Sequence, residues 1–264
     1  MISIRSARNA FFFRLRQKVR WQRGPFVERN EPKDSLRDHP ASDRIRDLEG
    51  RYDLAPLKAR SRLRTYLENL YLLDLLEAAH RGWTGNYGEA AIGIDAGCKN
   101  FFYAFGLFRF LERFRIHGTR KITLTGYEID AYRVYTDLRS RADHARGYAS
   151  FLPGTRFVAG DFLDAPGPAD LVTALFPFVT KTPHLAWGLP LDRLHPLAFF
   201  AHALKILTPG GVLVTAAQGE KEFDAHLAIL RRLKVEPALA ERFESRVLAF
   251  KNDRYVVRVE KAQR

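Results

Sequence analysis

The chain has one cysteine and one methionine among its 264 residues. Because a disulfide needs two cysteines, the lone Cys98 excludes an internal disulfide and favours a reducing compartment. No apolar run approaches the roughly 18 residues of a membrane-spanning helix. The run Phe11–Phe13 is also too short for the core of a signal peptide. We therefore expect a cytoplasmic protein with no membrane span.

Acidic residues are few relative to basic ones. There are 30 Asp and Glu against 43 Lys and Arg, a net charge of +13. Such a surface attracts phosphates and anionic membranes. The same excess of arginine is also typical of bacterial proteins from GC-rich genomes, where it needs no nucleic-acid role. The charge therefore leaves a nucleic-acid partner open without favouring it.

Residues 1–23 contain no acidic side chain at all. They hold seven basic residues, and apolar residues recur among them every three or four positions, as on one face of a helix: Ile4, Ala7, Phe11, Leu15 and Val19. A basic amphipathic helix can lie on a membrane surface, bind RNA, or pack its apolar face on protein. We expect packing on the main domain or on a second subunit, which makes a homodimer possible.

The next segment is rich in proline. Pro25, Pro32, Pro40 and Pro56 predict an extended or poorly ordered connection over residues 24–56. Leucines at helical spacing then predict a helix over residues 57–80, which glycines end. We divide the chain into a basic helical extension, linker and cap over residues 1–85 and one α/β domain over residues 86–264.

The domain opens on residues 90–100, AAIGIDAGCKN. They predict a buried strand, a tight turn at Gly97 and a helix from Phe101. Free backbone N–H groups at such a helix start, beside a glycine, are typical of a nucleotide-binding corner.

Alternating strands and helices follow. We expect helices over residues 101–114, 131–146, 196–207 and 220–233, a loop over 180–194, and strands over 121–127, 155–159, 169–176, 212–216, 246–250 and 255–260. The last two strands read as a hairpin. The pattern predicts an α/β fold: a Rossmann-like, mostly parallel seven-stranded sheet with an antiparallel last strand and helices on both faces.

Residues 88–260 resemble the class I S-adenosylmethionine-dependent methyltransferases. Four landmarks carry the resemblance, in the family's order: the Asp95–Gly97 loop, Glu128, Asp161 and the turn LTPGG over residues 207–211. A nicotinamide-linked dehydrogenase also needs an acid after its second strand, but its G-x-G-x-x-G pattern is missing here. The resemblance implies methyl transfer with S-adenosylmethionine as cofactor.

The resemblance also implies roles for individual residues. Glu128 would accept hydrogen bonds from both ribose hydroxyls of the cofactor. Asp161 would accept from the adenine amino group, the Phe162 N–H would meet a ring nitrogen, and Ile129 would cover the ring. The remaining cofactor-binding residues would be Asp95, Gly97, Cys98, Lys99, Asn100 and Phe176.

Lys99 departs from the family, which usually has a second glycine at this position. The cofactor carries a sulfonium cation, and two like charges about 6 Å apart repel by roughly 3 kcal/mol at an effective dielectric near 20. Lys99 must therefore point away from the sulfonium. Its ammonium could pair with the cofactor's carboxylate, face solvent, or block the pocket in a noncatalytic binding module.

The methyl acceptor is not readable from the sequence. Leu175–Phe178, LFPF, lacks the polar residue and two prolines of enzymes that methylate amino groups of bases, and the only cysteine lies in the cofactor loop. We expect a small-molecule or peptide acceptor, with an RNA-associated methyltransferase as the alternative. His184 is the candidate general base. No metal site is expected, and the candidate substrate-binding residues are Phe178, Trp187, Gln218 and Glu220.

Overall fold

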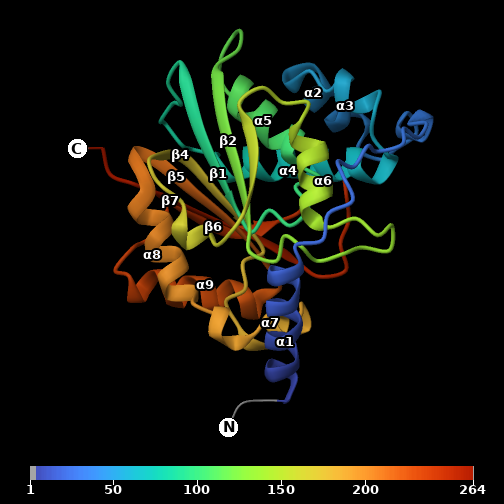
Figure 1. Ribbon diagram of the computed structural model, residues 1–264. Coiled ribbons are helices and arrows are strands. Elements are labelled where there is room, and N and C mark those ends of the chain that lie inside the picture. The colour runs from blue at the N-terminus through green and yellow to red at the C-terminus, as the bar shows by residue number, and fades with distance from the viewer. Residues whose placement is uncertain (1–3, 264) are drawn as a thin grey trace.

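The computed structural model describes residues 4–263. At its centre lies one seven-stranded sheet in the order β3-β2-β1-β4-β5-β7-β6 (Figure 1). All neighbouring strands are parallel except that β7 runs antiparallel to both β5 and β6. The predicted sheet is confirmed. Its strands are β1 (Ala90–Ala96), β2 (Lys121–Glu128), β3 (Thr155–Ala159), β4 (Ala169–Leu175), β5 (Leu207–Gln218), β6 (Leu239–Phe243) and β7 (Arg254–Glu260).

Helices cover both faces of the sheet (Figure 1). The apolar side chains of each layer form a separate core with the strands beneath them. The first layer holds α2 (Ser42–Tyr52), α3 (Ala55–Lys58), α4 (Leu63–Ala79), α5 (Ala104–Arg113) and α6 (Arg141–Ala149), and the second holds α8 (Pro196–Ile206) and α9 (Glu220–Arg232). Helix α4 is buried on nearly every side because it lies between the sheet, α2 and α5.

Residues 24–56 are more regular than the prolines predict. They contain a 3₁₀ turn at Asp34–Leu36 and the whole of α2, whose Ile45, Leu48 and Tyr52 are buried. The prolines lie outside α2 and so do not interrupt it. Residues 24–33 contain no helix or strand, as expected, but the predicted extended connection is wrong over residues 34–52. The single helix expected over residues 57–80 is two helices, α3 and α4, separated by residues 59–62.

Three further segments differ from expectation. Residues 131–140 form turns, and α6 begins only at Arg141, because Ser140 and Asp143 form a capping box there. Residues 246–250 are not a strand: the partner of β7 is β6, and Val247 is buried in the connection between them. The expected loop after β4 contains helix α7 (Lys181–Ala186) and a 3₁₀ turn at Leu191–Arg193.

The basic N-terminal segment forms the predicted helix, α1 (Ile4–Val19). The face it packs is not the predicted one. Ser6, Asn9 and Phe13 are its buried residues, whereas the apolar residues expected to pack are exposed. Helix α1 lies beside α7, away from the two helical layers (Figure 1). Among residues 4–263, no helix has both the length and the apolar character needed to cross a membrane.

Candidate active site

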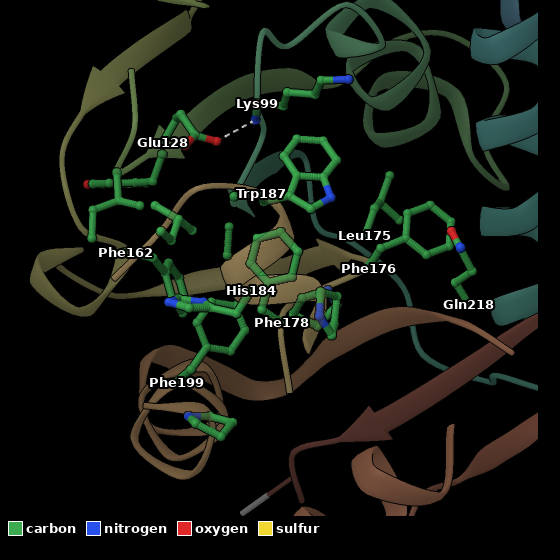
Figure 2. A pocket seen from close by; sticks show the side chains of 18 of the residues that line it. Lys99, Glu128, Phe162, Leu175, Phe176, Phe178, His184, Trp187, Phe199 and Gln218 are labelled. Atoms are coloured by element: carbon green, nitrogen blue, oxygen red, sulfur yellow. Dashed lines mark hydrogen bonds between the residues drawn. The ribbon is translucent and has the colours of Figure 1, made fainter. Parts of the chain in front are cut away.

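A cavity of about 410 Å³ lies where the loops after β1, β2, β3 and β4 meet. Ligands of open α/β sheets bind at this edge, beyond the carboxyl ends of the strands. Residues of α4 and α7 line the cavity, and many of the side chains in its wall are aromatic (Figure 2). A cavity of this size, with an apolar wall and a few polar groups, suits a small organic ligand.

The glycine loop between β1 and α5 is bent by three left-handed residues. Gly97 has φ +77°, Lys99 has φ +56° and Phe101 has φ +54°. Glycine adopts this conformation freely, whereas a residue with a side chain adopts it at a cost of about 1 kcal/mol. Lys99 therefore adopts a backbone conformation that glycine favours, although it carries a long side chain.

The N–H groups of this loop are not free, contrary to the expectation for a helix start. Gly97 and Cys98 both donate to the Tyr127 carbonyl, at 2.9 and 3.0 Å, and Lys99 donates to the Glu128 carboxylate at 2.9 Å. Helix α5 begins only at Ala104. Hydrogen bonds from these backbone N–H groups therefore hold the loop at the end of β2. Both residues that accept them line the cavity.

Glu128 ends β2 and lies on the cavity wall, 6% exposed. Its Oε1 accepts from the Asp130 N–H at 2.8 Å and from Arg141 at 3.0 Å, and its Oε2 accepts from Lys99 (Figure 2). A carboxylate has about four lone-pair sites. Three are occupied, so Oε2 retains room for one further donor rather than the two expected.

Trp187 reaches from just after α7 into the cavity between two cations (Figure 2). The Lys99 ammonium lies 5.2 Å from the indole ring centre and the Arg141 guanidinium 5.3 Å from it. Both distances allow cation–π attraction. Burial, and then the charge of Arg141, lower the pKa of Lys99. Trp187 thus joins the α7 segment to the glycine loop across the cavity.

The loop after β3 contributes Asp161 and Phe162. The Asp161 carboxylate accepts from the Leu163 N–H at 3.0 Å and caps a 3₁₀ turn. The Phe162 ring packs against Phe199 of α8, with ring centres 4.9 Å apart. Ile129, after β2, lines the same part of the cavity. This half of the cavity therefore combines one carboxylate with flat apolar walls.

Asp95 is fully buried behind the cavity and does not line it. It accepts hydrogen bonds from Thr173 of β4 at 2.6 Å and from Tyr103, before α5, at 2.8 Å. Burial raises the pKa of its carboxyl to about 6. Asp95 therefore holds the glycine loop in place. Cys98 is also buried away from the cavity, where burial raises the pKa of its thiol.

His184 of α7 lines the cavity and is 2% exposed. Its Nε2 lies 2.8 Å from the Pro190 carbonyl and so carries the proton, which leaves the Nδ1 lone pair free. Among residues 4–263 that Nδ1 atom has no hydrogen-bond partner. Burial lowers the pKa of His184, so the imidazole is neutral near pH 7.

The structure brings most of the predicted residues to this one cavity. It is lined by Gly97, Lys99, Glu128, Ile129, Asp161, Phe162, Phe176, Phe178, His184, Trp187 and Gln218. Four predicted residues are not among those that line it: Asp95, Cys98, Asn100 and Glu220.

Sequence reasoning missed the wall contributed by the first helical layer. Glu68, Tyr71 and Leu72 of α4 line the cavity together with Phe250 and with Glu222 of α9. The leucine pattern of α4 predicts burial but does not show that one end of the helix borders a cavity. Arg141 was missed because residues 131–146 were assigned to a single helix.

No protein-family model matches the chain, and no curated protein does either. Solved structures similar to it include TrmN from Thermus thermophilus, at 18% identity and TM-score 0.46, over 70% of this chain and 47% of TrmN. Another is a SAM-dependent methyltransferase from Aquifex aeolicus, at 12% identity and TM-score 0.49, over 74% of this chain and 96% of that one. A third is magnesium protoporphyrin IX methyltransferase from Synechocystis with bound SAM, at 12% identity and TM-score 0.46, over 86% of this chain and 94% of that one.

The chain thus spans about half the length of TrmN. At these identities the similarity concerns the fold alone, and the strand order of this chain defines that fold by itself. The fold is the one that the resemblance implies.

Proposed function

We propose that this protein is an S-adenosylmethionine-dependent methyltransferase. The observation that carries the proposal is that three of the four landmark positions meet at one cavity: Gly97 after β1, Glu128 at the end of β2 and Asp161 after β3 all line it, whereas residues 207–211 begin β5 and do not. These three residues are far apart in sequence and share this edge only because the sheet is parallel.

The residues present fit the cofactor. The free lone-pair site on Glu128 suits a ribose hydroxyl, and a hydrogen bond to a charged group contributes about 1.5–3 kcal/mol. The apolar walls at Ile129 and Phe162 suit an adenine ring, with Asp161 as acceptor for its amino group. The Lys99 ammonium suits the cofactor's carboxylate.

When bound, S-adenosylmethionine supplies an electrophilic methyl group on a sulfonium. The chain's own residues would position and desolvate the reactants. Trp187 and Phe178, whose ring centres are 5.7 Å apart, supply an apolar wall to the cavity. His184 is the group that could take the acceptor's proton, at Nδ1, because its Nε2 is committed to Pro190.

The acceptor we propose is a small molecule or a peptide side chain. The cavity is also lined by the rings of Tyr71, Phe176 and Phe250 and by the carboxylates of Glu68 and Glu222. Burial raises the pKa of Glu222. This combination suits a largely apolar acceptor that carries a polar or cationic group. An RNA acceptor is the less favoured alternative, because many of the side chains that line the cavity are aromatic.

Calorimetric titration with S-adenosylmethionine and S-adenosylhomocysteine tests the proposal. We expect micromolar binding of both ligands and about tenfold weaker binding in Glu128→Gln, since a neutral amide is a weaker acceptor. Glutamine is chosen over alanine because it preserves the length of a side chain that three protein groups contact. Glu236→Gln, at an exposed position, is the matched control and should bind normally.

A noncatalytic binding module on the same fold is the second candidate. It is favoured by Lys99 and Trp187, which bring bulky side chains to the glycine loop. Absence of binding of either ligand up to millimolar concentration would favour this candidate and refute the first.

A further inference from the structure

Helix α1 is attached to the body of the protein by its polar face. Asn9 donates to the carbonyls of Leu185 and Leu189 on the α7 segment, at 3.0 and 3.1 Å. Arg16 forms a two-pronged ion pair with the buried Asp130, at 2.7 and 3.0 Å. Gln17 donates to the Ile129 carbonyl at 2.8 Å. A helix held in this way must turn its opposite face outward.

That outward face is apolar. The exposed fractions are 90% for Ile4, 63% for Phe11, 47% for Phe12, 44% for Leu15 and 59% for Val19. We call these five residues the outer stripe. Positions 4, 11, 15 and 19 follow helical spacing and form one row along the whole helix. Trp21, just beyond the helix, is 48% exposed. An isolated exposed leucine needs no explanation, but five large apolar side chains exposed on one helix, two of them phenylalanines, indicate an interaction surface.

Cations lie within and beside the outer stripe. Arg5, Arg8, Arg14 and Lys18 are exposed, and none of the ion pairs found among residues 4–263 includes them. The helix contains no acidic residue to offset them. The surface is therefore a face of aromatic and aliphatic side chains that has Arg8 within it, between Ile4 and Phe11, and the other cations at its margins.

We propose that α1 docks in the plane of an anionic phospholipid bilayer, with the outer stripe inserted at the boundary between headgroups and acyl chains. Apolar residues on the inserted face, with basic residues beside the headgroups, are the features of helices that bind at this interface. The bordering cations complement anionic headgroups.

Charge and shape decide against the other occupants. A second copy would present the same stripe with the same cations, so a symmetric contact would bring like charges together. RNA phosphates would satisfy the cations but leave the aliphatic members Ile4, Leu15 and Val19 without a partner. A bilayer satisfies both parts of the surface at once.

Docking would also place the cavity near the bilayer. Helix α1 holds the α7 segment through Asn9, and that segment supplies His184 and Trp187 to the cavity wall. The docking proposal itself stands on α1 and does not depend on the proposed methyl transfer.

The test is co-sedimentation of the full chain with vesicles of phosphatidylglycerol and phosphatidylcholine in equal parts, and with vesicles of phosphatidylcholine alone. We expect binding to the anionic vesicles that weakens as salt rises. Phe11→Ser with Leu15→Ser should lower the partition coefficient at least about tenfold, because both side chains lose their apolar insertion. Arg8→Gln with Lys18→Gln should lower it several-fold.

Phe151→Ser is the matched control, since Phe151 is 51% exposed and lies outside α1. It should bind vesicles as the unaltered chain does. Equal binding by the Phe11 and Leu15 variant, or no binding to anionic vesicles, would overturn the proposal. The proposal would also be overturned if the chain does not bind vesicles but uses the outer stripe to form a dimer or to bind single-stranded RNA. All variants change exposed residues, and an unchanged thermal midpoint checks their folding.

Discussion

Lys99 shows how one residue can decide the electrostatics of the cavity. Its backbone is left-handed, a conformation that glycine favours, while its ammonium lies over Trp187. Either it attracts the carboxylate of a bound ligand or it repels a sulfonium. The two effects are separable because S-adenosylhomocysteine has the carboxylate but lacks the sulfonium charge.

We predict that Lys99→Met weakens the binding of S-adenosylmethionine and S-adenosylhomocysteine by the same several-fold factor, because both lose one ion pair. Calorimetry of the two ligands measures the ratio. Tighter binding of S-adenosylmethionine alone would mean that Lys99 opposes the sulfonium instead. Methionine keeps the unbranched stem, so the left-handed backbone is not further strained.

The ion pair of Glu128 with Arg141 is buried on both sides, with side chains 7% and 5% exposed. Removing one partner of such a pair leaves a charge without compensation. We predict that Arg141→Met lowers the free energy of unfolding by about 3 kcal/mol, as measured by urea denaturation. The control is Arg46→Met, which removes an exposed pair with Asp43 and should cost less than about 1 kcal/mol.

At the scale of elements, the sequence predicts the sheet better than its connections. Strands β2 and β4 are mostly buried, and burial favours their extended conformation. The predicted strand over residues 246–250, RVLAF, is more apolar than β2, but its hydrogen-bonding place beside β7 is taken by β6. Pairing choices of this kind depend on contacts distant in sequence and leave no local pattern.

The orientation of α1 illustrates the same limit. Helical spacing predicts the helix correctly, but the rule that apolar faces turn inward predicts the wrong face. Specific hydrogen bonds of Asn9, Arg16 and Gln17 fix the orientation instead. For the candidate site, acids at strand ends could be predicted because parallel strands end together. Arg141 and the α4 wall could not, because they approach from other layers.

The attachment of α1 to α7 can be tested directly. We predict that Asn9→Ala, which removes two hydrogen bonds to the α7 segment, increases amide hydrogen exchange over residues 181–193 by several-fold. Mass spectrometry of the exchanged peptides measures the effect. Arg5→Ala, on the exposed side of α1, should leave exchange unchanged. Equal exchange in both variants would show that α1 does not restrain α7.

For the whole molecule, buried histidines predict a loss of stability in acid. Burial lowers the pKa of His226 from 6.5 to about 4 and that of His80 to about 3. Between about pH 6.5 and about pH 4, these histidines bind protons in the unfolded chain but not in the folded chain. The free energy of unfolding therefore falls as pH falls over this range. Asp95 acts oppositely, because burial raises its pKa to about 6 and its folded form gains the proton first.

We predict that His226 alone contributes about 2 kcal/mol to the fall between about pH 7 and about pH 5. His226→Gln should remove this contribution. The free energy of unfolding, measured by urea denaturation, should then differ less between the two pH values than it does in the unaltered chain. His117, which is exposed, supplies the control His117→Gln, and the difference should then be unchanged. Equal pH dependence in all three proteins would contradict the prediction.

The position of β7 has a consequence for synthesis. This strand follows the other six in sequence yet lies between β5 and β6, and its Arg258 donates to the carbonyls of Ala79 and Arg81 at the end of α4. A nascent chain that has emerged only as far as β6 therefore exposes one edge of β5 and one edge of β6, because β7, which pairs with both, is still missing. Its sheet closes only after Arg254–Glu260 leaves the ribosome, so translation that stalls shortly before this segment leaves an aggregation-prone intermediate.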